Sequence, residues 1–267
     1  MKEKLIHLLQ VKEDIPSIFP HELFSFGPFS FSPATMMAML AVLFFTYLAF
    51  RTSKFKLVPS YFQHIMEMLV LFVLDFIEKI IGNKEKAKML LPYIGSIFLF
   101  ILFANLFSLI PIISSITFEG HNLFSASTAD FNTTFSLALA SVFIIHIVGI
   151  TENGFFSHLS HFIKIKGIVV GFRKSVGDGF LAIVEFFVGL IEIIGEIAKV
   201  ISLSLRLFGN MFAHEVLMII LLGSLSIGIP AIWMGMGILV GIVQAIVFMA
   251  LITVYYSLLV MTDKSKH

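Results

Sequence analysis

The sequence contains no cysteine among its 267 residues, and charged residues make up only 13% of it. The absence of cysteine excludes disulfides, iron–sulfur clusters and thiolate metal sites. A hydrophobic content of 58% and a mean hydropathy of +1.00 leave too little polar surface for a protein surrounded by water. We therefore expect an integral membrane protein whose main contact is the lipid bilayer. The formal net charge of +1 gives no indication of a nucleic-acid partner.

Long apolar runs predict an all-α fold that forms a single membrane domain over residues 1–267. One crossing needs about 20 apolar helical residues. We expect about five crossings and one amphipathic interfacial helix, which Glu67, Asp75 and Glu78 mark by interrupting its apolar positions. The expected segments are an outward N-terminal segment at 1–33, a first crossing at 34–50, the interfacial helix at 59–81, a helical hairpin at 89–113 and 132–161, and two long helices at 176–222 and 230–262.

The last two segments are longer than a membrane requires. Between Phe180 and Leu222 there is no proline, and a helix of this length extends roughly 60 Å, about twice the thickness of the hydrocarbon core. Such a helix must tilt steeply, bend or break, and we expect both long helices to be strongly tilted. In the hairpin, Pro92 is expected in the first turn, where a helix tolerates proline.

The positions of lysine and arginine predict the orientation in the membrane. Basic residues gather in the regions 51–90 and 163–175 and in the tail, whereas the region 114–131 has none and carries Glu119 and Asp130. Cytoplasmic loops are the ones enriched in lysine and arginine. Five crossings with the N-terminus outside and the C-terminus in the cytoplasm place every basic loop on the cytoplasmic side. Glu192 and Glu196 then lie toward the cytoplasm.

An arginine stands in the middle of an apolar run between Ser202 and Glu215. Arg206 cannot lose its proton, and a charge at membrane depth costs between ~3 and over 10 kcal/mol. At about 100° per residue, a polar stripe runs along the same helix, whereas Glu215 points to the opposite side. The stripe consists of Glu185, Glu192, Glu196, Lys199, Arg206, Asn210 and His214. On the final helix Gln244 and Tyr255 are nearly aligned, and Gly235, Gly237 and Gly241 allow another helix to approach closely.

Two interpretations of the stripe follow from the residues. In the first, the charges pair internally and serve assembly: Glu196 pairs with Lys199, and Arg206 bonds to Asn210 and to a neighbouring helix. In the second, the stripe conducts ions, which explains acids at one end, a lone arginine in the middle and His214 with Glu215 at the other. Lys199 either balances Glu196 or lies along the inner path. His158 and His161 lack the pattern of a metal site, and no metal site is expected.

The motif RLFGNM at 206–211 is highly specific, and further matches occur at NLFSLIP (105–111), ADFNTTFSLAL (129–139), KIKGI (164–168) and QAIVFMALITVYY (244–256). With these motifs the chain resembles subunit a of the membrane sector of bacterial F-type ATP synthases over roughly residues 20–262. The resemblance implies an ion-translocating stator subunit without catalytic residues or cofactors of its own. It implies as partners the rotor subunits of the c-ring, the b subunits of the peripheral stalk and, through the stalk, the soluble ATPase sector. The expected location is the bacterial cytoplasmic membrane.

The resemblance also implies roles for individual residues. Arg206 matches the arginine that faces the rotor and separates two aqueous half-channels, which most often carry protons. Glu192 matches the acid of the cytoplasmic half-channel, and Asn210, Glu215 and Gln244 match polar residues of the central and outward paths. Glu196 and His214 join this ion-translocation set, with Lys199, Ser202 and Tyr255 as further members.

The chain departs from several bacterial relatives at two positions. They have glycine before the acid and histidine on the last helix, whereas this chain has His214 and Gly237. The exchange of a large and a small residue suits positions that face each other, so we expect His214 and Gly237 to lie opposite one another in the outer cavity.

Other functions fit the sequence less well. A secondary transporter or ion channel with a polar intramembrane pathway is the alternative, but no inverted repeat accompanies the polar residues. An intramembrane hydrolase needs a metal-ligand or nucleophile–base set, and the sequence suggests none.

Overall fold

The computed structural model describes residues 24–26, 29–52, 60–110, 116–118, 121–155, 176–224 and 228–264. Its long helices are α2 (Pro33–Thr52), α3 (Tyr61–Ile81), α4 (Lys84–Ser108), α6 (Phe131–Asn153), α9 (Val176–Ser224) and α10 (Gly228–Lys264). Two small antiparallel hairpins pair β1 (Phe24–Phe26) with β2 (Phe29–Phe31) and β3 (Thr117–Phe118) with β4 (His121–Asn122). A 3₁₀ turn, η1 (Ser127–Ala129), precedes α6.

The predicted fold class, an all-α membrane protein, is confirmed. Four of the described helices, α2, α4, α6 and α10, are long and apolar enough to cross a membrane. The fifth crossing, expected along α9, stays a prediction, because α9 is not among these four. Residues 1–23 of the expected N-terminal segment lie outside the described residues. Residues 156–161 of the expected hairpin, which include His158 and His161, also lie outside them, and so does the KIKGI motif.

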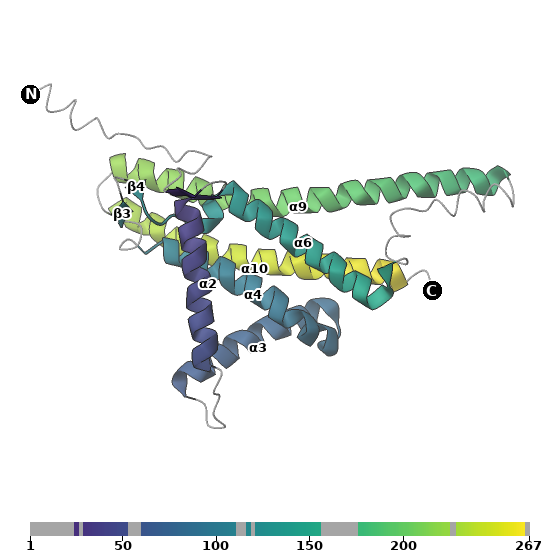
Figure 1. Ribbon diagram of the computed structural model, residues 1–267, viewed down its shortest axis with the longest axis horizontal. Coiled ribbons are helices and arrows are strands. Elements are labelled where there is room, and N and C mark those ends of the chain that lie inside the picture. Colours follow the sequence, from purple (N-terminus) through teal and green to yellow (C-terminus); the bar gives the residue numbers. More distant parts are fainter. Residues whose placement is uncertain are drawn as a thin grey trace, which may run out of the picture.

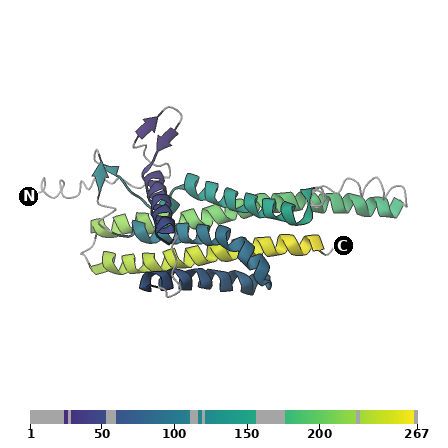
Figure 2. The same ribbon diagram turned by 60° about the horizontal axis from the view of Figure 1, so that its bottom comes forward.

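The long axis of the molecule is set by α9 and α10, which run beside each other (Figure 1). The first part of α9 projects beyond the other helices, and α2 crosses the direction of the long pair. Turning the molecule shows α3 running along α10 on the side away from α9 (Figure 2). Since α2 crosses the α9–α10 direction, α2 and the long pair cannot all follow the membrane normal, which agrees with a strong tilt of the long helices.

The expected start of the first hairpin helix was wrong. α4 begins at Lys84, five residues before the expected 89, because the Asn83 side chain accepts hydrogen bonds from the backbone N–H groups of Glu85 and Lys86 at 3.0 and 3.1 Å. Pro92 therefore lies inside the helix rather than in its first turn. The turn before α4 reverses at Gly82, whose φ of 71° is the left-handed conformation that glycine adopts without strain.

The core lies where α4 and α10 meet, with α3, α6 and α9 packed around them. Ile101 of α4, Met249 and Tyr256 of α10, and Leu203 and Leu207 of α9 are fully buried there. In α9, Leu203 and Leu207 are one turn apart, so the helix turns one continuous stripe toward the core. Burial of this stripe decides which face of α9 points away from the core.

Candidate functional site

Arg206 lies on the outer face of α9. Its neighbours one turn before and after, Ser202 and Asn210, are exposed with it, whereas Leu203 and Leu207 are 1% exposed and face the core. These three polar residues therefore share one exposed face of α9. The packing of α9 places the charge at the outer surface of the helix bundle.

The guanidinium of Arg206 has no hydrogen-bond or ion-pair partner among the residues that the structure describes. The interpretation in which the charges pair internally had two parts. The part in which Asn210 and a neighbouring helix hold Arg206 finds no support among the described residues. The other part is confirmed, because the Lys199 Nζ lies 2.6 Å from the Glu196 Oε1. Lys199 thus balances Glu196, and Arg206 has no counter-charge among the residues that the structure describes.

An inner polar cluster gathers side chains from three helices. Glu196 and Lys199 come from α9, His146 from α6 and Tyr255 from α10. The second carboxylate oxygen of Glu196, Oε2, lies 3.3 Å from the Nε2 of His146. The Lys199 Nζ lies 5.1 Å from the centre of the Tyr255 ring, within the range of a cation–π contact. We call these four residues the inner cluster.

Glu192 lies one turn before Glu196 on α9 and is half-buried, whereas Glu185 is exposed. The predicted acids therefore occur on one stretch of α9, but only Glu196 belongs to the inner cluster. Of the residues predicted on α10, Tyr255 contacts this cluster and Gln244 is half-buried farther toward the start of the helix.

Glu215 belongs to a different environment from Arg206, as the helical angles predicted. Its Oε1 accepts a hydrogen bond of 3.0 Å from the backbone N–H of Ala126, directly before the 3₁₀ turn. Within this turn, Thr128 donates a hydrogen bond to the Oδ1 of the fully buried Asn105. The segment that leads into α6 thus contacts Glu215 of α9 and Asn105 of α4.

His214 is buried against Trp233 of α10. The two rings are stacked with centroids 5.6 Å apart and planes 11° apart. The Trp233 Nε1 donates to the backbone oxygen of His214 at 3.2 Å, and the His214 Nε2 lies 3.3 Å from the backbone oxygen of Trp233. A carbonyl oxygen only accepts, so this contact requires a proton on Nε2 and leaves Nδ1 as the second proton site of the ring.

The predicted opposition of His214 and Gly237 is confirmed. A Cβ atom on Gly237 would lie 2.3 Å from the His214 Nε2, a distance that no side chain tolerates. Gly241 permits a similar close approach, since its Cβ would lie 3.1 Å from the Cβ of Asn105, and its carbonyl oxygen accepts from the Asn105 amide at 3.4 Å. Gly235 has no such neighbour, so the close-approach prediction holds for two of the three glycines.

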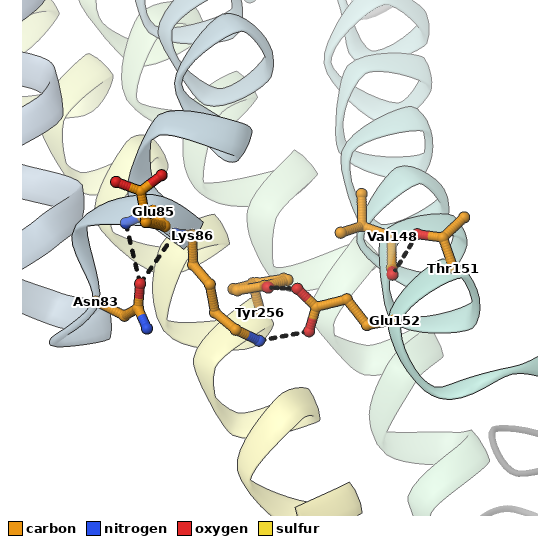
Figure 3. Close-up of polar contacts among 7 residues, drawn as sticks. All are labelled: Asn83, Glu85, Lys86, Val148, Thr151, Glu152 and Tyr256. Carbon is orange, nitrogen blue, oxygen red and sulfur yellow. Dashed lines mark hydrogen bonds and ion pairs between the residues drawn. The ribbon is translucent and has the colours of Figure 1, made fainter.

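A second polar cluster joins α4, α6 and α10 and was not foreseen (Figure 3). The Glu152 carboxylate accepts a hydrogen bond of 2.6 Å from the Tyr256 hydroxyl and lies 2.5 Å from the Lys86 Nζ. Figure 3 shows Lys86 and Tyr256 both pointing toward Glu152 across the space between the helices. Each oxygen of this carboxylate therefore has its own partner, and three helices are tied at one point.

Sequence reasoning missed His146, Glu152 and Trp233 as site residues. His146 carried a usable signal, because an ionisable side chain inside an apolar run is costly, the same reason that singled out Arg206. Glu152 and Trp233 carried none, since their partners lie on other helices. Within the described part of the chain, no three histidine or acidic side chains come together as metal ligands would.

Comparison with known proteins gives consistent results. A family model described as ATP synthase A chain matches residues 33–257. The chain is 36% identical over 241 residues to ATP synthase subunit a of Desulforamulus reducens, covering 85% of this chain and 79% of the relative. It is 35% identical over 221 residues to ATP synthase subunit a 1 of Pelobacter propionicus, covering 83% of each. It is 37% identical over 204 residues to ATP synthase subunit a of Geobacter sulfurreducens, covering 76% of each.

The contact at Gly237 gives a first prediction. Gly237→Ala places a methyl group against the His214 ring and should lower stability by about 1 to 3 kcal/mol, the usual cost of overpacking. Gly235→Ala is the matched control, because its Cβ meets nothing within 4 Å. Thermal melting of the detergent-purified protein measures both, and His214→Ala in the Gly237→Ala background should restore stability. Equal melting temperatures for the two single alanine variants would contradict the contact.

The Glu152 cluster gives a second prediction. Lys86→Met removes the cation that lies against the half-buried Glu152 carboxylate and should destabilise the fold by about 1 to 3 kcal/mol, less than a fully buried pair because both side chains retain some solvent access. Lys88→Met is the control, since Lys88 pairs with Glu85 at an exposed site worth about 0 to 1 kcal/mol. If both variants melt together, the Glu152 cluster does not hold the three helices.

Proposed function

We propose the function of this chain from its family. The chain belongs to the ATP synthase A chain family. It is accordingly a multi-pass membrane component of a multisubunit ATP synthase. Beyond this, we propose that the chain is the ion-translocating stator subunit of the rotary complex. It provides two aqueous half-channels to carboxyl groups on the rotor, and Arg206 separates them.

The proposal rests on the guanidinium of Arg206, which is exposed and has no partner among the described residues. An apolar helix bundle gains nothing from a permanent charge that no described side chain of the chain neutralises. The cost is offset when a carboxylate from another subunit comes to this face. Ser202 and Asn210, exposed on the same face, are suited to hydrogen-bond with water or with that subunit.

A fixed positive charge at this face does two things to an arriving rotor carboxyl. It favours the ionised form of the carboxyl group, so the bound ion is released. It also repels cations that would pass directly from one half-channel to the other, so ions cross only by riding on the rotor. Arginine suits this role better than lysine, because a buried lysine can lose its proton.

The polar groups on the two sides of Arg206 along α9 support two separate paths. Glu192 and Glu196 lie on one side of Arg206 along the helix, and Glu215 with His214 on the other. Gln244 of α10 belongs to the same outer and central set. We propose that ions enter beside Glu215, neutralise a rotor carboxyl, travel with it around the ring and leave beside Glu192. The driving force is about 2.3 kcal/mol per charge per 100 mV.

The proposed orientation has the N-terminus outside and the C-terminus in the cytoplasm of a bacterial cell. Support comes from the arrangement of the helix ends: the start of α9 and the ends of α6 and α10 lie toward the same end of the long axis (Figure 1). In the sequence, these helix ends adjoin the basic region 163–175 and the basic C-terminal tail, and basic segments are expected on the cytoplasmic side. The proposed partners are the c-ring on the α9 face, the b subunits of the peripheral stalk and, through the stalk, the soluble ATPase sector.

Replacing the arginine tests the proposal directly. Arg206→Ala should abolish coupled ATP synthesis and ATP-driven pumping while permitting a passive ion leak, because nothing then separates the half-channels. Pumping and passive leak are measured in membrane vesicles with matched amounts of assembled complex. Unimpaired ATP-driven pumping in this variant would refute the assignment.

The outer path gives a separate prediction. Glu215→Gln should slow ion flux more than Glu119→Gln, because only Glu215 is proposed to line the path, although both acids are predicted on the outer side. Passive flux through complexes stripped of the soluble sector is the measurement. Equal effects of the two substitutions would mean that the outer path runs elsewhere.

A further inference from the structure

Trp233 is the only tryptophan of the sequence, and it is joined to His214 by three contacts. The two rings are stacked, with centroids 5.6 Å apart. The Trp233 Nε1 donates a hydrogen bond of 3.2 Å to the backbone oxygen of His214, and the His214 Nε2 lies 3.3 Å from the backbone oxygen of Trp233. Each residue therefore holds the backbone of the other, and α9 and α10 are joined in both directions.

The surface of α10 is shaped for this pair. In a helix, the carbonyl of one residue points toward the N–H group four positions later, so the Trp233 carbonyl points toward Gly237. A Cβ atom on Gly237 would lie 2.3 Å from the His214 Nε2. A side chain at position 237 would therefore take the place from which the imidazole reaches the carbonyl. The contact needs glycine one turn after the tryptophan.

The carbonyl that accepts from the indole belongs to the peptide group between His214 and Glu215. Because a peptide group is planar and stiff, a hydrogen bond to its oxygen also restrains the Cα atom of Glu215. The side chain of Glu215 is held from another direction, since its Oε1 accepts a hydrogen bond of 3.0 Å from the Ala126 N–H. Thus α10 holds the backbone of this acid, and the segment leading into α6 holds its carboxylate.

The Ala126 N–H is itself held in place. Ala126 is 1% exposed, and its backbone oxygen accepts from the Ala129 N–H at 2.9 Å. In the same turn, Thr128 donates to the buried Asn105 of α4. A donor and an acceptor 3.6 Å apart no longer form a hydrogen bond, so a displacement of α9 by roughly 1 Å is enough to lose the Glu215 contact.

We propose that Trp233 is a positioning residue of the outer half-channel, which keeps Glu215 where its carboxylate meets the Ala126 N–H. This rests on the proposed function, in which ions enter beside Glu215, and adds to it the residue that fixes the position of that acid. Trp233 acts through the His214 peptide group and not on the ion. The His214 ring completes the pair by donating its Nε2–H to the Trp233 carbonyl.

A simpler role for the pair is to fasten α9 to α10 without any effect on Glu215 in particular. The two roles differ in what happens when Glu215 is already displaced from its contact. A positioning residue then has nothing left to position, whereas a fastening residue still contributes in full. Combined substitutions at positions 233 and 215 separate the two, because independent effects multiply and coupled effects do not.

The measurement is passive ion flux through the membrane sector in liposomes, driven from the outer side by a fixed potential and normalised to assembled complex. Trp233→Phe keeps a ring for stacking but has no Nε1–H. We expect its flux to fall roughly three- to tenfold, the effect of one lost hydrogen bond. Trp233→Leu should be at least as slow, whereas stacking alone would leave the Phe variant active. Ile232→Ala, at a position 72% exposed, is the matched control and should conduct as the wild type.

Glu215→Asp provides the second background. It keeps a carboxyl group, but the side chain is one methylene shorter and no longer reaches the Ala126 N–H. In this background Trp233→Phe should lower flux by less than about twofold, within the usual error of additivity. The same three- to tenfold fall in both backgrounds would show that the tryptophan only fastens the helices, and it would overturn the proposal.

A closer analogue covers the case in which Trp233→Phe does not assemble. Replacing the indole of Trp233 by benzothiophene puts sulfur in place of the N–H and preserves the size of the ring. Wild-type flux with this analogue overturns the positioning role. If Glu215→Gln is then slower than Glu119→Gln, the proposed outer path stands and only the positioning role is lost. If those two variants conduct equally, the outer path itself is wrong, and the role of Trp233 is rejected with it.

Discussion

The structure depends on how a mostly apolar bundle accommodates ionisable side chains. A charge in contact with lipid or with other helices is stable only when a partner offsets the lost hydration. Glu196 has Lys199 and His146, and Glu152 has Lys86 and Tyr256. Arg206 differs from these two carboxylates, because its guanidinium has no partner among the described residues. The pairing of these two carboxylates makes an arginine without a described partner a meaningful feature rather than one polar residue among many.

The paired clusters also explain how the helices keep their relative positions. Contacts between apolar side chains in a membrane protein gain little from the hydrophobic effect once the helices are in lipid, so close packing and polar contacts carry more of the specificity. The Glu152 cluster joins α4, α6 and α10, and the inner cluster joins α6, α9 and α10. At the outer side, Gly237 and Gly241 allow α10 to come close to His214 and Asn105. Contacts on both sides of Arg206 thus hold α9 and α10 together, and the exposed face of α9 remains available for another subunit.

Two groups on opposite sides of Arg206 are arranged in a similar way. Each contains a histidine whose Nε2 contacts an oxygen atom, a carboxylate for His146 and a backbone carbonyl for His214. In both cases the acceptor is an oxygen atom, so the contact places a proton on Nε2 and helps to orient the ring. The proposed entrance and exit of the ion path thus have related chemistry, although the two histidines come from different helices and hold different partners.

The sequence by itself determined the membrane class, the approximate extent of the helices, the stripe on α9 and the opposed direction of Glu215, because these follow from hydropathy and from the angle between successive residues of one helix. It also indicated that His214 faces Gly237, because the large and the small residue are exchanged between these two positions relative to several bacterial relatives. Only the tertiary structure decided which polar groups of different helices meet. His146 reaches Glu196, Glu152 reaches Lys86, and Asn210 does not hold Arg206, since these outcomes depend on helix rotation and on the depth at which the helices cross. Packing, not periodicity, fixes both quantities.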